Sequence, residues 1–257
     1  MYDWLQGRGA GREYISMEHE TYQQLLAGGL QAATPSLSEQ VIQAFQAIPR
    51  HRFLDHYYLR SYEDGTSVWT RHERDEAAVW YEQVYSDRLL VTRVDEHGRI
   101  LSSSSHPWVM ASMLDALDLR PGMRVLEIGT GTSYNAALLA HLAGDAHLIT
   151  TLDLDGDAIE RAKQIIPPVA GDGMTIVQAD GRNGYDANAP YDRIIATAST
   201  PALPRSWLMQ LAPDGILVGI LQPRFAPRGW PAQSAEARGE IGREHAANDV
   251  FHRASSG

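Results

Sequence analysis

The sequence predicts an α/β fold in which a mostly parallel sheet is covered by helices on both faces. From Arg124 onward, short apolar runs alternate with helical segments, and a turn with two glycines joins the first run to the first helix. Strands are expected at residues 125–128, 147–152, 175–178, 192–197 and 216–221, and helices at 134–143, 157–166 and 204–211. This alternation is typical of parallel sheets, in which ligands bind beyond the carboxyl ends of the strands.

The chain before and after this sheet is organised differently. Its 257 residues, 44% of them hydrophobic, can bury one substantial core with a small second subdomain. We expect residues 1–34 to form a loosely attached arm and residues 35–222 to form the main domain. That domain divides into an N-terminal helical, substrate-side part (35–107) and an α/β core (108–222). Residues 223–257 show no pair of closing strands, so we expect a divergent tail, either poorly ordered or docked on the surface.

Three elements and a serine run are expected between the arm and the sheet. A serine-capped helix ends before Pro49. A strand follows at 89–94, and a helix at 108–117 leads directly into the glycine turn. Between them, the four serines at 102–105 form either a flexible loop or a hydroxyl-rich loop over the mouth of the ligand crevice.

Composition excludes several classes of function. The chain has no cysteine, so disulfides, thiolate catalysis and cysteine-ligated metals are excluded, and this fits a cytoplasmic protein. A formal net charge of −10 argues against nucleic acid as the main partner, because phosphate neutralisation needs a basic face. No apolar run approaches the roughly 20 residues that span a bilayer. His51, His56 and His72 lack the close spacing of metal ligands, so we expect neither a metal site nor membrane association.

The glycine turn can serve a dinucleotide or S-adenosylmethionine. Asp153, 22 residues after Gly131, can accept hydrogen bonds from ribose hydroxyls of either ligand. Glu127, just before the turn, would face the positively charged amino-acid part of S-adenosylmethionine and would repel a pyrophosphate. The alternate-residue spacing of Gly129, Gly131 and Ser133 also differs from the wider gap of a dinucleotide fingerprint. These features favour S-adenosylmethionine.

A further acid and glycine end the third predicted strand. Asp180 can offer a carboxylate, and Gly181 a backbone N–H, to the edge of an adenine ring. Taken alone, the pair is more simply interpreted as an ordinary turn. Together with the glycine turn, it adds to the case for S-adenosylmethionine.

A set of short motifs runs in order through roughly residues 38–220. They are Ile48-Pro49-Arg50 with Phe53, Tyr85-Ser86-Asp87, Ser105-His106-Pro107, the glycine turn at 125–134, Ala179-Asp180-Gly181 with Gly184, Ala189-Pro190-Tyr191-Asp192, Pro204 and the segment 210–215. In this ordered combination the chain resembles the protein-L-isoaspartate O-methyltransferase family.

The resemblance implies a Rossmann-like class I S-adenosylmethionine-dependent methyltransferase that esterifies a carboxylate. The acceptor would be an isoaspartyl or aspartyl residue of a protein or peptide, and the ester would then form a succinimide. The serine run and the alanine-rich first helix of the core are most similar to members that modify ribosomally made precursor peptides. Ser105 would donate a hydrogen bond that aims the acceptor carboxylate, without acting as a nucleophile. The expected cofactor-binding residues are Glu127, Gly129, Thr130, Gly131, Asp153, Asp180 and Gly181.

Two departures from the family pattern keep other functions open. Ser133 replaces the usual third glycine and adds a Cβ near the methionine portion of the cofactor. The tail after Leu221 does not resemble the closing strands of the family. The alternatives are a small-molecule methyltransferase on the same fold, a non-catalytic cofactor-binding partner and, more remotely, a nicotinamide dehydrogenase.

Overall fold

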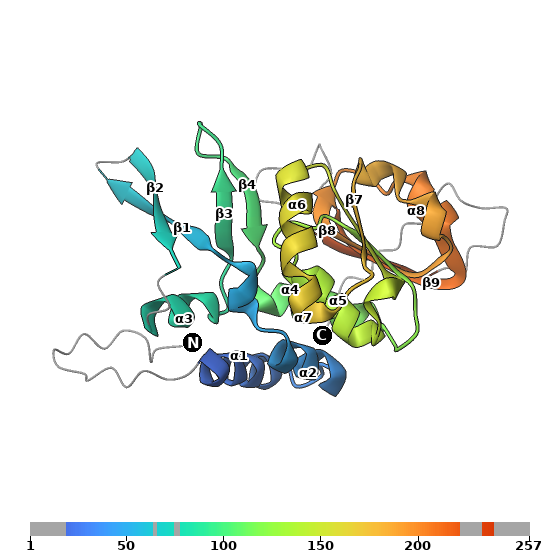
Figure 1. The fold of residues 1–257 in the computed structure, drawn as a ribbon, viewed down its shortest axis with the longest axis horizontal. Coiled ribbons are helices and arrows are strands. Elements are labelled where there is room, and N and C mark those ends of the chain that lie inside the picture. Colours follow the sequence, from blue (N-terminus) through green and yellow to red (C-terminus); the bar gives the residue numbers. More distant parts are fainter. Residues whose placement is uncertain (1–18, 64–65, 75–77, 222–232, 239–257) are drawn as a thin grey trace.

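Two sheets of different construction meet in this protein, as Figure 1 shows for the computed structural model. The structure describes residues 19–63, 66–74, 78–221 and 233–238. The larger sheet has six strands in the order β10-β9-β8-β5-β6-β7. Strands β5 to β9 are parallel, and β10 is antiparallel to β9. These strands are β5 (Val125–Ile128), β6 (Ile149–Asp153), β7 (Thr175–Gln178), β8 (Tyr191–Thr200), β9 (Leu211–Leu221) and β10 (Gln233–Arg238).

Helices cover both faces of this sheet, as the sequence predicted. Along β5, Val125 belongs to the cluster formed with α1, α2, α4 and α5, whereas Leu126 belongs to the cluster beneath α8. Successive side chains of a strand point to opposite faces, which explains the division. The helices are α1 (His19–Ala33), α2 (Glu39–Ala47), α3 (Ala78–Val84), α4 (Pro107–Ala116), α5 (Tyr134–Ala143), α6 (Gly156–Ile165), α7 (Pro167–Ala170) and α8 (Arg205–Gln210). The 3₁₀ turns are η1 (Arg50–Phe53), η2 (Ala146–Leu148), η3 (Gly181–Asn183) and η4 (Asp186–Asn188).

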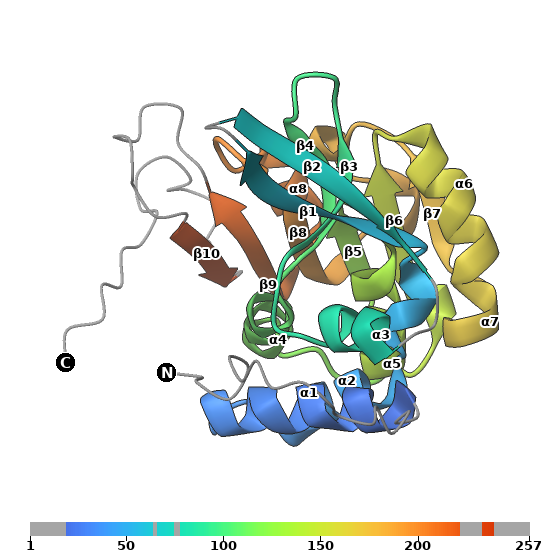
Figure 2. The same cartoon turned by 90° about the vertical axis from the view of Figure 1, so that its left-hand side faces the viewer.

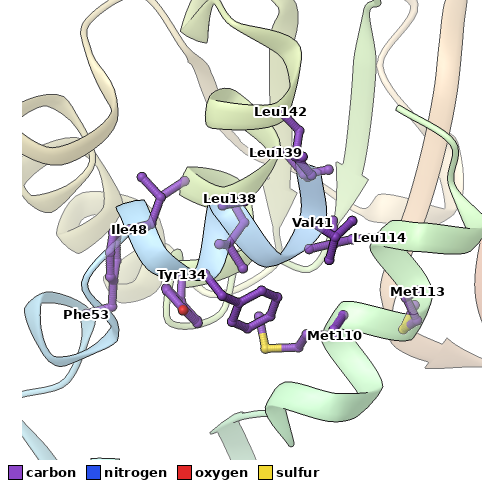
Figure 3. Packing of buried hydrophobic residues seen from close by; sticks show 14 of the residues in the cluster. Val41, Ile48, Phe53, Met110, Met113, Leu114, Tyr134, Leu138, Leu139 and Leu142 are labelled. Atoms are coloured by element: carbon purple, nitrogen blue, oxygen red, sulfur yellow. The ribbon is translucent and has the colours of Figure 1, made fainter. Parts of the chain in front are cut away.

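Helix α5 is the centre of the core. Every residue of it except His141 is buried, which explains why its sequence is apolar on all sides. Its alanines let neighbouring elements approach closely, while its larger side chains fill the space between α2 and α4. Figure 3 shows Val41 of α2 against Leu114 of α4, with Tyr134 and Leu138 of α5 in the same cluster. The glycine turn is therefore followed by a helix that is fixed on all sides.

The segment 19–33 corrects our expectation of a loosely attached arm. It forms α1, which lies beside α2 at the bottom of the molecule in both views (Figures 1 and 2). Leu26 and Leu30 are buried in the main core, and Gln23 Nε2 donates to the carbonyl oxygens of Phe45 and Gln46 at 3.1 and 2.8 Å. Residues 1–18 lie outside the described part of the chain.

Residues 35–107 contain a second sheet that the expectation of a helical part missed. Its strands, in the order β2-β1-β3-β4, are all antiparallel. Sequence reasoning found only the β3 strand. The strands are β1 (His56–Glu63), β2 (Thr66–Glu73), β3 (Leu90–Val94) and β4 (Ile100–Ser104).

The serine run belongs to this sheet, so the prediction of a loop at 102–105 is wrong for most of its length. Ser104 pairs with Leu90 and Ser103 pairs with Val91 in the β3–β4 ladder. The ladder satisfies the backbone N–H and C=O groups, and Ser104 is buried in it. Long-range pairing has overridden the low strand propensity of serine.

The tail also contains an element that we did not expect. Strand β10 pairs with β9 from Gln233 opposite Leu221 to Arg238 opposite Ile216. This strand adds an antiparallel edge to the parallel sheet, so a closing pair of strands does exist. Residues 222–232 and 239–257 lie outside the described part. Within the described part, no helix is long and apolar enough to cross a membrane.

Leu26 and Leu25 provide a test of the attachment of α1. Leu26 is 6% exposed, whereas its neighbour Leu25 is 61% exposed. We expect Leu26→Ala to lower the free energy of unfolding by about 2–4 kcal/mol, because truncation leaves a cavity. Leu25→Ala should change it by less than about 0.5 kcal/mol. Urea denaturation of both variants measures the difference, and equal values would show that α1 is not part of the cooperative core.

Candidate active site

The glycine turn after β5 is fixed by a close contact with β8. Gly129 has φ +102°, and a Cβ there would lie 2.6 Å from Thr197 Oγ1. Thr197 Oγ1 is itself placed to donate to the carbonyl oxygens of Gly129 and Ile128, at 2.6 and 3.1 Å. Only glycine fits both the dihedral angle and the space. The turn is therefore held against the neighbouring strand.

A cavity of about 480 Å³ opens above this turn. Its size is within the range of small-ligand and cofactor sites. One wall comes from the carboxyl ends of β5 and β6 and the turns that follow them, and the other comes from β3, β4 and α4. The lining includes Arg93, Ser102, Ser103, Ser104, Ser105, Gly129, Thr130, Gly131, Asn135, Asp153, Asp155 and Gly181.

Asp153 lies where the sequence placed it, at the end of β6 and in the cavity wall. Its Oδ2 accepts a hydrogen bond from the Gly131 N–H at 2.9 Å, and its Oδ1 accepts one from the Asp155 N–H at 3.0 Å. Each carboxylate oxygen can accept a further hydrogen bond. Asp153 thus ties the glycine turn to β6 and retains acceptor capacity toward the cavity.

Glu127 lies beneath the turn and outside the cavity lining. Its Oε1 accepts from Asn135 Nδ2 at 2.8 Å and its Oε2 from Thr151 Oγ1 at 2.6 Å. Thr151 has a single hydroxyl proton, so the 2.7 Å contact between the hydroxyls of Thr130 and Thr151 makes Thr130 the donor. Burial raises the pKa of Glu127 to about 7, against the opposing effect of its two hydrogen bonds. Glu127 reaches the cavity only through Asn135 and Thr130.

The structure separates the members of the Asp180-Gly181 pair. Gly181 lines the cavity, and a Cβ there would lie 2.5 Å from Ile128 Cγ2. Asp180 lies outside the lining and caps η3, accepting from the Arg182 N–H at 3.0 Å. Its hydrogen bonds with the Arg182 side chain hold the pKa of Asp180 below its usual value. Asp180 therefore shapes the turn that presents Gly181.

The four serines form the opposite wall of the cavity. Ser102 to Ser105 all line it. The glycine turn and Ser105, which is predicted to orient the acceptor carboxylate, therefore face the same space. The Ser105 carbonyl oxygen accepts from Arg50 Nη2 at 2.9 Å. His106 is exposed, and its Nδ1 lies 3.2 Å from the Asp87 carbonyl oxygen.

Sequence reasoning missed two arginines near this cavity. Arg93 of β3 forms an ion pair with Asp155 across the wall, over a separation of 62 residues that no local pattern reveals. Arg50 is fully buried behind the serines. Its place in the motif Ile48-Pro49-Arg50 was the available signal. In the described residues, no cluster of three or more histidines, aspartates and glutamates could hold a metal ion.

These residues suit a cationic nucleoside ligand. Gly131 lines the cavity, has φ +49° and would have no atom within 4 Å of an added Cβ, so the space beside it is open. Asp153 offers acceptors for hydroxyl groups, and its negative charge suits a positively charged group. The parallel sheet, the glycine turn after β5 and the acid after β6 define a Rossmann-like α/β protein that binds a nucleoside cofactor beyond the carboxyl ends of its strands.

The family follows from comparison with known proteins. The model of the protein-L-isoaspartate(D-aspartate) O-methyltransferase family matches residues 21–225, and the chain belongs to that family. This confirms the predicted family and makes S-adenosylmethionine its cofactor. Protein-L-isoaspartate O-methyltransferase 2 of Archaeoglobus fulgidus is 31% identical over 183 residues, which are 71% of this chain and 71% of the relative. The Methanosarcina mazei relative is 32% identical over 201 residues, 78% of this chain and 70% of its own length.

Solved structures agree with this fold. A protein-L-isoaspartate O-methyltransferase structure superposes with a TM-score of 0.66 at 27% identity, covering 84% of this chain and 59% of its own. A second structure, a putative protein-L-isoaspartate O-methyltransferase from Plasmodium falciparum with S-adenosyl-L-homocysteine, has a TM-score of 0.62 and 16% identity. It covers 83% of this chain and 88% of its own, and at that identity it supports the fold alone.

Ser133 is strained, which gives a prediction for stability. It has φ +70°, it is 1% exposed, and its Oγ has no hydrogen-bond partner among the described residues. It also lies outside the cavity lining, so its effect on the cofactor stays a prediction. We expect Ser133→Gly to raise the free energy of unfolding by about 1 kcal/mol, because glycine tolerates this backbone conformation.

Ser38 supplies the matched control for this substitution. Its Oγ is also buried without a described partner, but its φ is −64°. Ser38→Gly should therefore destabilise the protein by about 0.5–1 kcal/mol. Thermal or urea denaturation compares the two, and destabilisation by both substitutions would contradict the proposed strain.

Because burial raises the pKa of Glu127, we expect the stability of the protein to depend on pH. In the unfolded chain its carboxyl ionises above its ordinary pKa of 4.5, whereas in the folded protein burial raises that pKa to about 7. Between these values the folded state holds the extra proton, so the contribution of Glu127 to stability falls as pH rises from 4.5 to 7. We expect the stability of the native protein relative to Glu127→Gln to fall by about 1–3 kcal/mol over this range.

Urea denaturation at pH 4.5, 6 and 7.5 measures this difference. Glu160→Gln removes one charge from an exposed glutamate of α6 and serves as the control. If the difference in free energy of unfolding between the native protein and Glu127→Gln did not change with pH, Glu127 would not be a buried carboxyl that is protonated in the folded state.

Proposed function

We propose that this chain methylates the carboxylate of an isoaspartyl or aspartyl residue in a protein or peptide. One observation carries the proposal: a single cavity is lined by the glycine turn with Asp153 on one wall and by the four serines on the other. The first wall suits the nucleoside of the cofactor, and the second offers hydroxyl donors to an acid. The names of the curated relatives describe the same chemistry for those proteins.

The acceptor needs no general base. A carboxylic acid has an ordinary pKa of about 4, so it is already an anion at neutral pH. When bound, S-adenosylmethionine would supply an electrophilic methyl group: the carboxylate oxygen would form the bond to it and become a methyl ester, while the electrons of the broken C–S bond would stay on sulfur and give S-adenosylhomocysteine. Ser105 donates a hydrogen bond that orients the carboxylate. His106 is exposed and lies outside the cavity lining, which agrees with a site that uses no histidine base.

The cofactor-binding residues divide into two groups in this proposal. Gly129, Thr130, Gly131, Asp153 and Gly181 line the cavity and would contact the cofactor, with Asp153 accepting from ribose hydroxyls. Glu127 and Asp180 do not line the cavity and would support the residues that contact the cofactor. Glu127 supports the turn through Thr151 and Asn135, and Asp180 caps η3.

Transfer of tritiated methyl groups tests the reaction and its acceptor. An isoaspartyl peptide, the matching aspartyl peptide and small dicarboxylic acids are offered in parallel, and the product is tested for the base lability of an ester. We expect labelling of one or both peptides and none of the small acids. Labelling of the small acids alone would contradict the proposal and support the small-molecule alternative.

The aspartyl peptide also tests the finer assignment to a dedicated precursor peptide. That assignment is supported by the serine run and the alanine-rich α5. Preference for aspartyl over isoaspartyl acceptors would support it, and the reverse preference would favour a general isoaspartyl acceptor.

Ser105→Ala separates orientation of the acceptor from binding of the cofactor. We expect kcat to fall about 10–100-fold, because one hydrogen-bond donor to the reacting group is lost. The Kd for S-adenosylmethionine, measured by calorimetry, should stay within about twofold. Ser102→Ala, which removes a hydroxyl from the same cavity wall, should change kcat by less than about threefold. Full activity of the Ser105 variant on the peptide would refute its role.

A further inference from the structure

A fully buried arginine lies directly behind the serine wall. All three guanidinium nitrogens of Arg50 donate hydrogen bonds, and none of their acceptors is a carboxylate. Among the described residues no carboxylate lies within ion-pair distance of it. The acceptors are the carbonyl oxygens of Val84 (2.9 Å), Ser86 (3.1 Å), Arg88 (3.2 Å), Ser104 (3.3 Å) and Ser105 (2.9 Å), and Ser104 Oγ (3.1 and 3.2 Å).

An arginine in this setting needs an explanation. Burial is unfavourable for a charge and lowers the pKa of Arg50 to about 10, although the negative charge of Asp87 acts in the opposite direction. The group nevertheless stays protonated at neutral pH. Five carbonyl oxygens gathered around one guanidinium would leave several acceptors unpaired if the side chain were removed. The arrangement therefore places a permanent positive charge at this point of the fold.

Arg50 joins two segments that lie on either side of Ser105, the residue predicted to orient the acceptor carboxylate. It holds the loop at 84–88 and the end of β4 at the same time. That loop is linked independently to the start of α4, because Asp87 Oδ1 accepts from the Trp108 N–H at 2.9 Å. Ser105 lies between these two fixed points and still lines the cavity. Its position follows from the Arg50 contacts.

The charge of Arg50 also complements the acceptor. Three charged residues line the cavity, and of these Asp153 and Asp155 are negative, while Arg93 is engaged with Asp155. The whole chain carries a formal charge of −10. Because Arg93 and Asp155 form an ion pair, Asp153 is the negative charge of the lining that an anionic acceptor would meet. Arg50 lies 2.9 Å from the Ser105 carbonyl oxygen, in an interior where charges are weakly screened.

We propose that Arg50 is the positioning residue of the acceptor site. It fixes the Ser104–Ser105 segment and supplies the positive potential that attracts the acceptor carboxylate. This inference rests on the proposed function, since it assumes that a carboxylate is bound beside Ser105. Arg50 does not line the cavity, so it acts through the serines and through its field.

Arg193 provides a matched control at the other end of the sheet. It is also buried, near the start of β8, and it donates to the carbonyl oxygens of Asp118 (2.9 and 3.2 Å) and Asp192 (2.8 Å). Unlike Arg50, it also lies 3.7 Å from a carboxylate oxygen, Asp118 Oδ2. Because ligands lie at the carboxyl ends of parallel strands, Arg193 is remote from the cavity. A substitution there tests what loss of a buried arginine does to stability alone.

Arg50→Lys and Arg193→Lys are compared for thermal unfolding, for the Kd of S-adenosylmethionine and for steady-state methylation of the peptide. Lysine keeps the charge but cannot reach all the carbonyl oxygens. We expect Arg50→Lys to lower kcat/KM for the peptide at least 30-fold, with the Kd within about threefold. Arg193→Lys should lower the melting temperature comparably and keep kcat/KM within threefold. If kcat/KM of Arg50→Lys for the peptide were within threefold of the native value, the proposal would be overturned.

A chemical rescue experiment and a second variant test the role of Arg50 further. Arg50→Ala with added ethylguanidinium should regain at least tenfold in kcat/KM, whereas the neutral analogue ethylurea should not. If Arg50 variants do not fold, Ser104→Ala removes one acceptor of Arg50 and should lower kcat/KM about fivefold; no loss would overturn the proposal.

Amide hydrogen exchange separates failure of this inference from failure of the proposed function. Without any substrate, Arg50→Lys should speed exchange of the amides at residues 102–106 at least tenfold, and Arg193→Lys should not. If the native protein methylates no peptide, the proposed function fails, and the exchange result still decides whether Arg50 fixes this segment. Unchanged exchange there would overturn the positioning role.

Discussion

The structure depends on the position of one backbone turn. Gly129 lies so close to Thr197 that a side chain there is impossible, and the Gly131 N–H is bound to Asp153. These two contacts join the ends of β5, β6 and β8 at a single point. Helix α5, buried on nearly every side, then holds the far end of the turn. The cofactor wall of the cavity follows from this constraint.

The opposite wall of the cavity, which carries Ser102 to Ser105, is stabilised by different contacts. The antiparallel sheet β2-β1-β3-β4 has its own hydrogen-bond ladders, and only its β3–β4 side reaches the cavity. Arg50 fixes the end of β4 from the interior, and the Arg93–Asp155 ion pair connects β3 to the turn after β6. A methyl transfer needs two reactants at a fixed separation, and these contacts hold the two walls in relation to each other.

The sequence predicted what depends on local pattern. The strand at 125–128 and the helix at 134–143 have the predicted boundaries, because an apolar run, a glycine turn and an alanine-rich segment specify them locally. The β1–β2 hairpin and the serine strand were missed, since their stability comes from pairing between distant residues. Glu127 was expected to face the cofactor, but hydrogen bonds to Asn135 and Thr151 keep it beneath the turn. Arg50 meets partners 34 to 55 residues away, which no spacing rule reveals.

We conclude that the cavity above the glycine turn holds S-adenosylmethionine rather than a dinucleotide. Titration calorimetry of the purified chain with S-adenosylmethionine, S-adenosylhomocysteine and NAD tests it most directly. We expect one-to-one binding of S-adenosylmethionine, competition by S-adenosylhomocysteine and no heat with NAD. Binding of NAD, or a folded protein that binds neither sulfur compound, would contradict it.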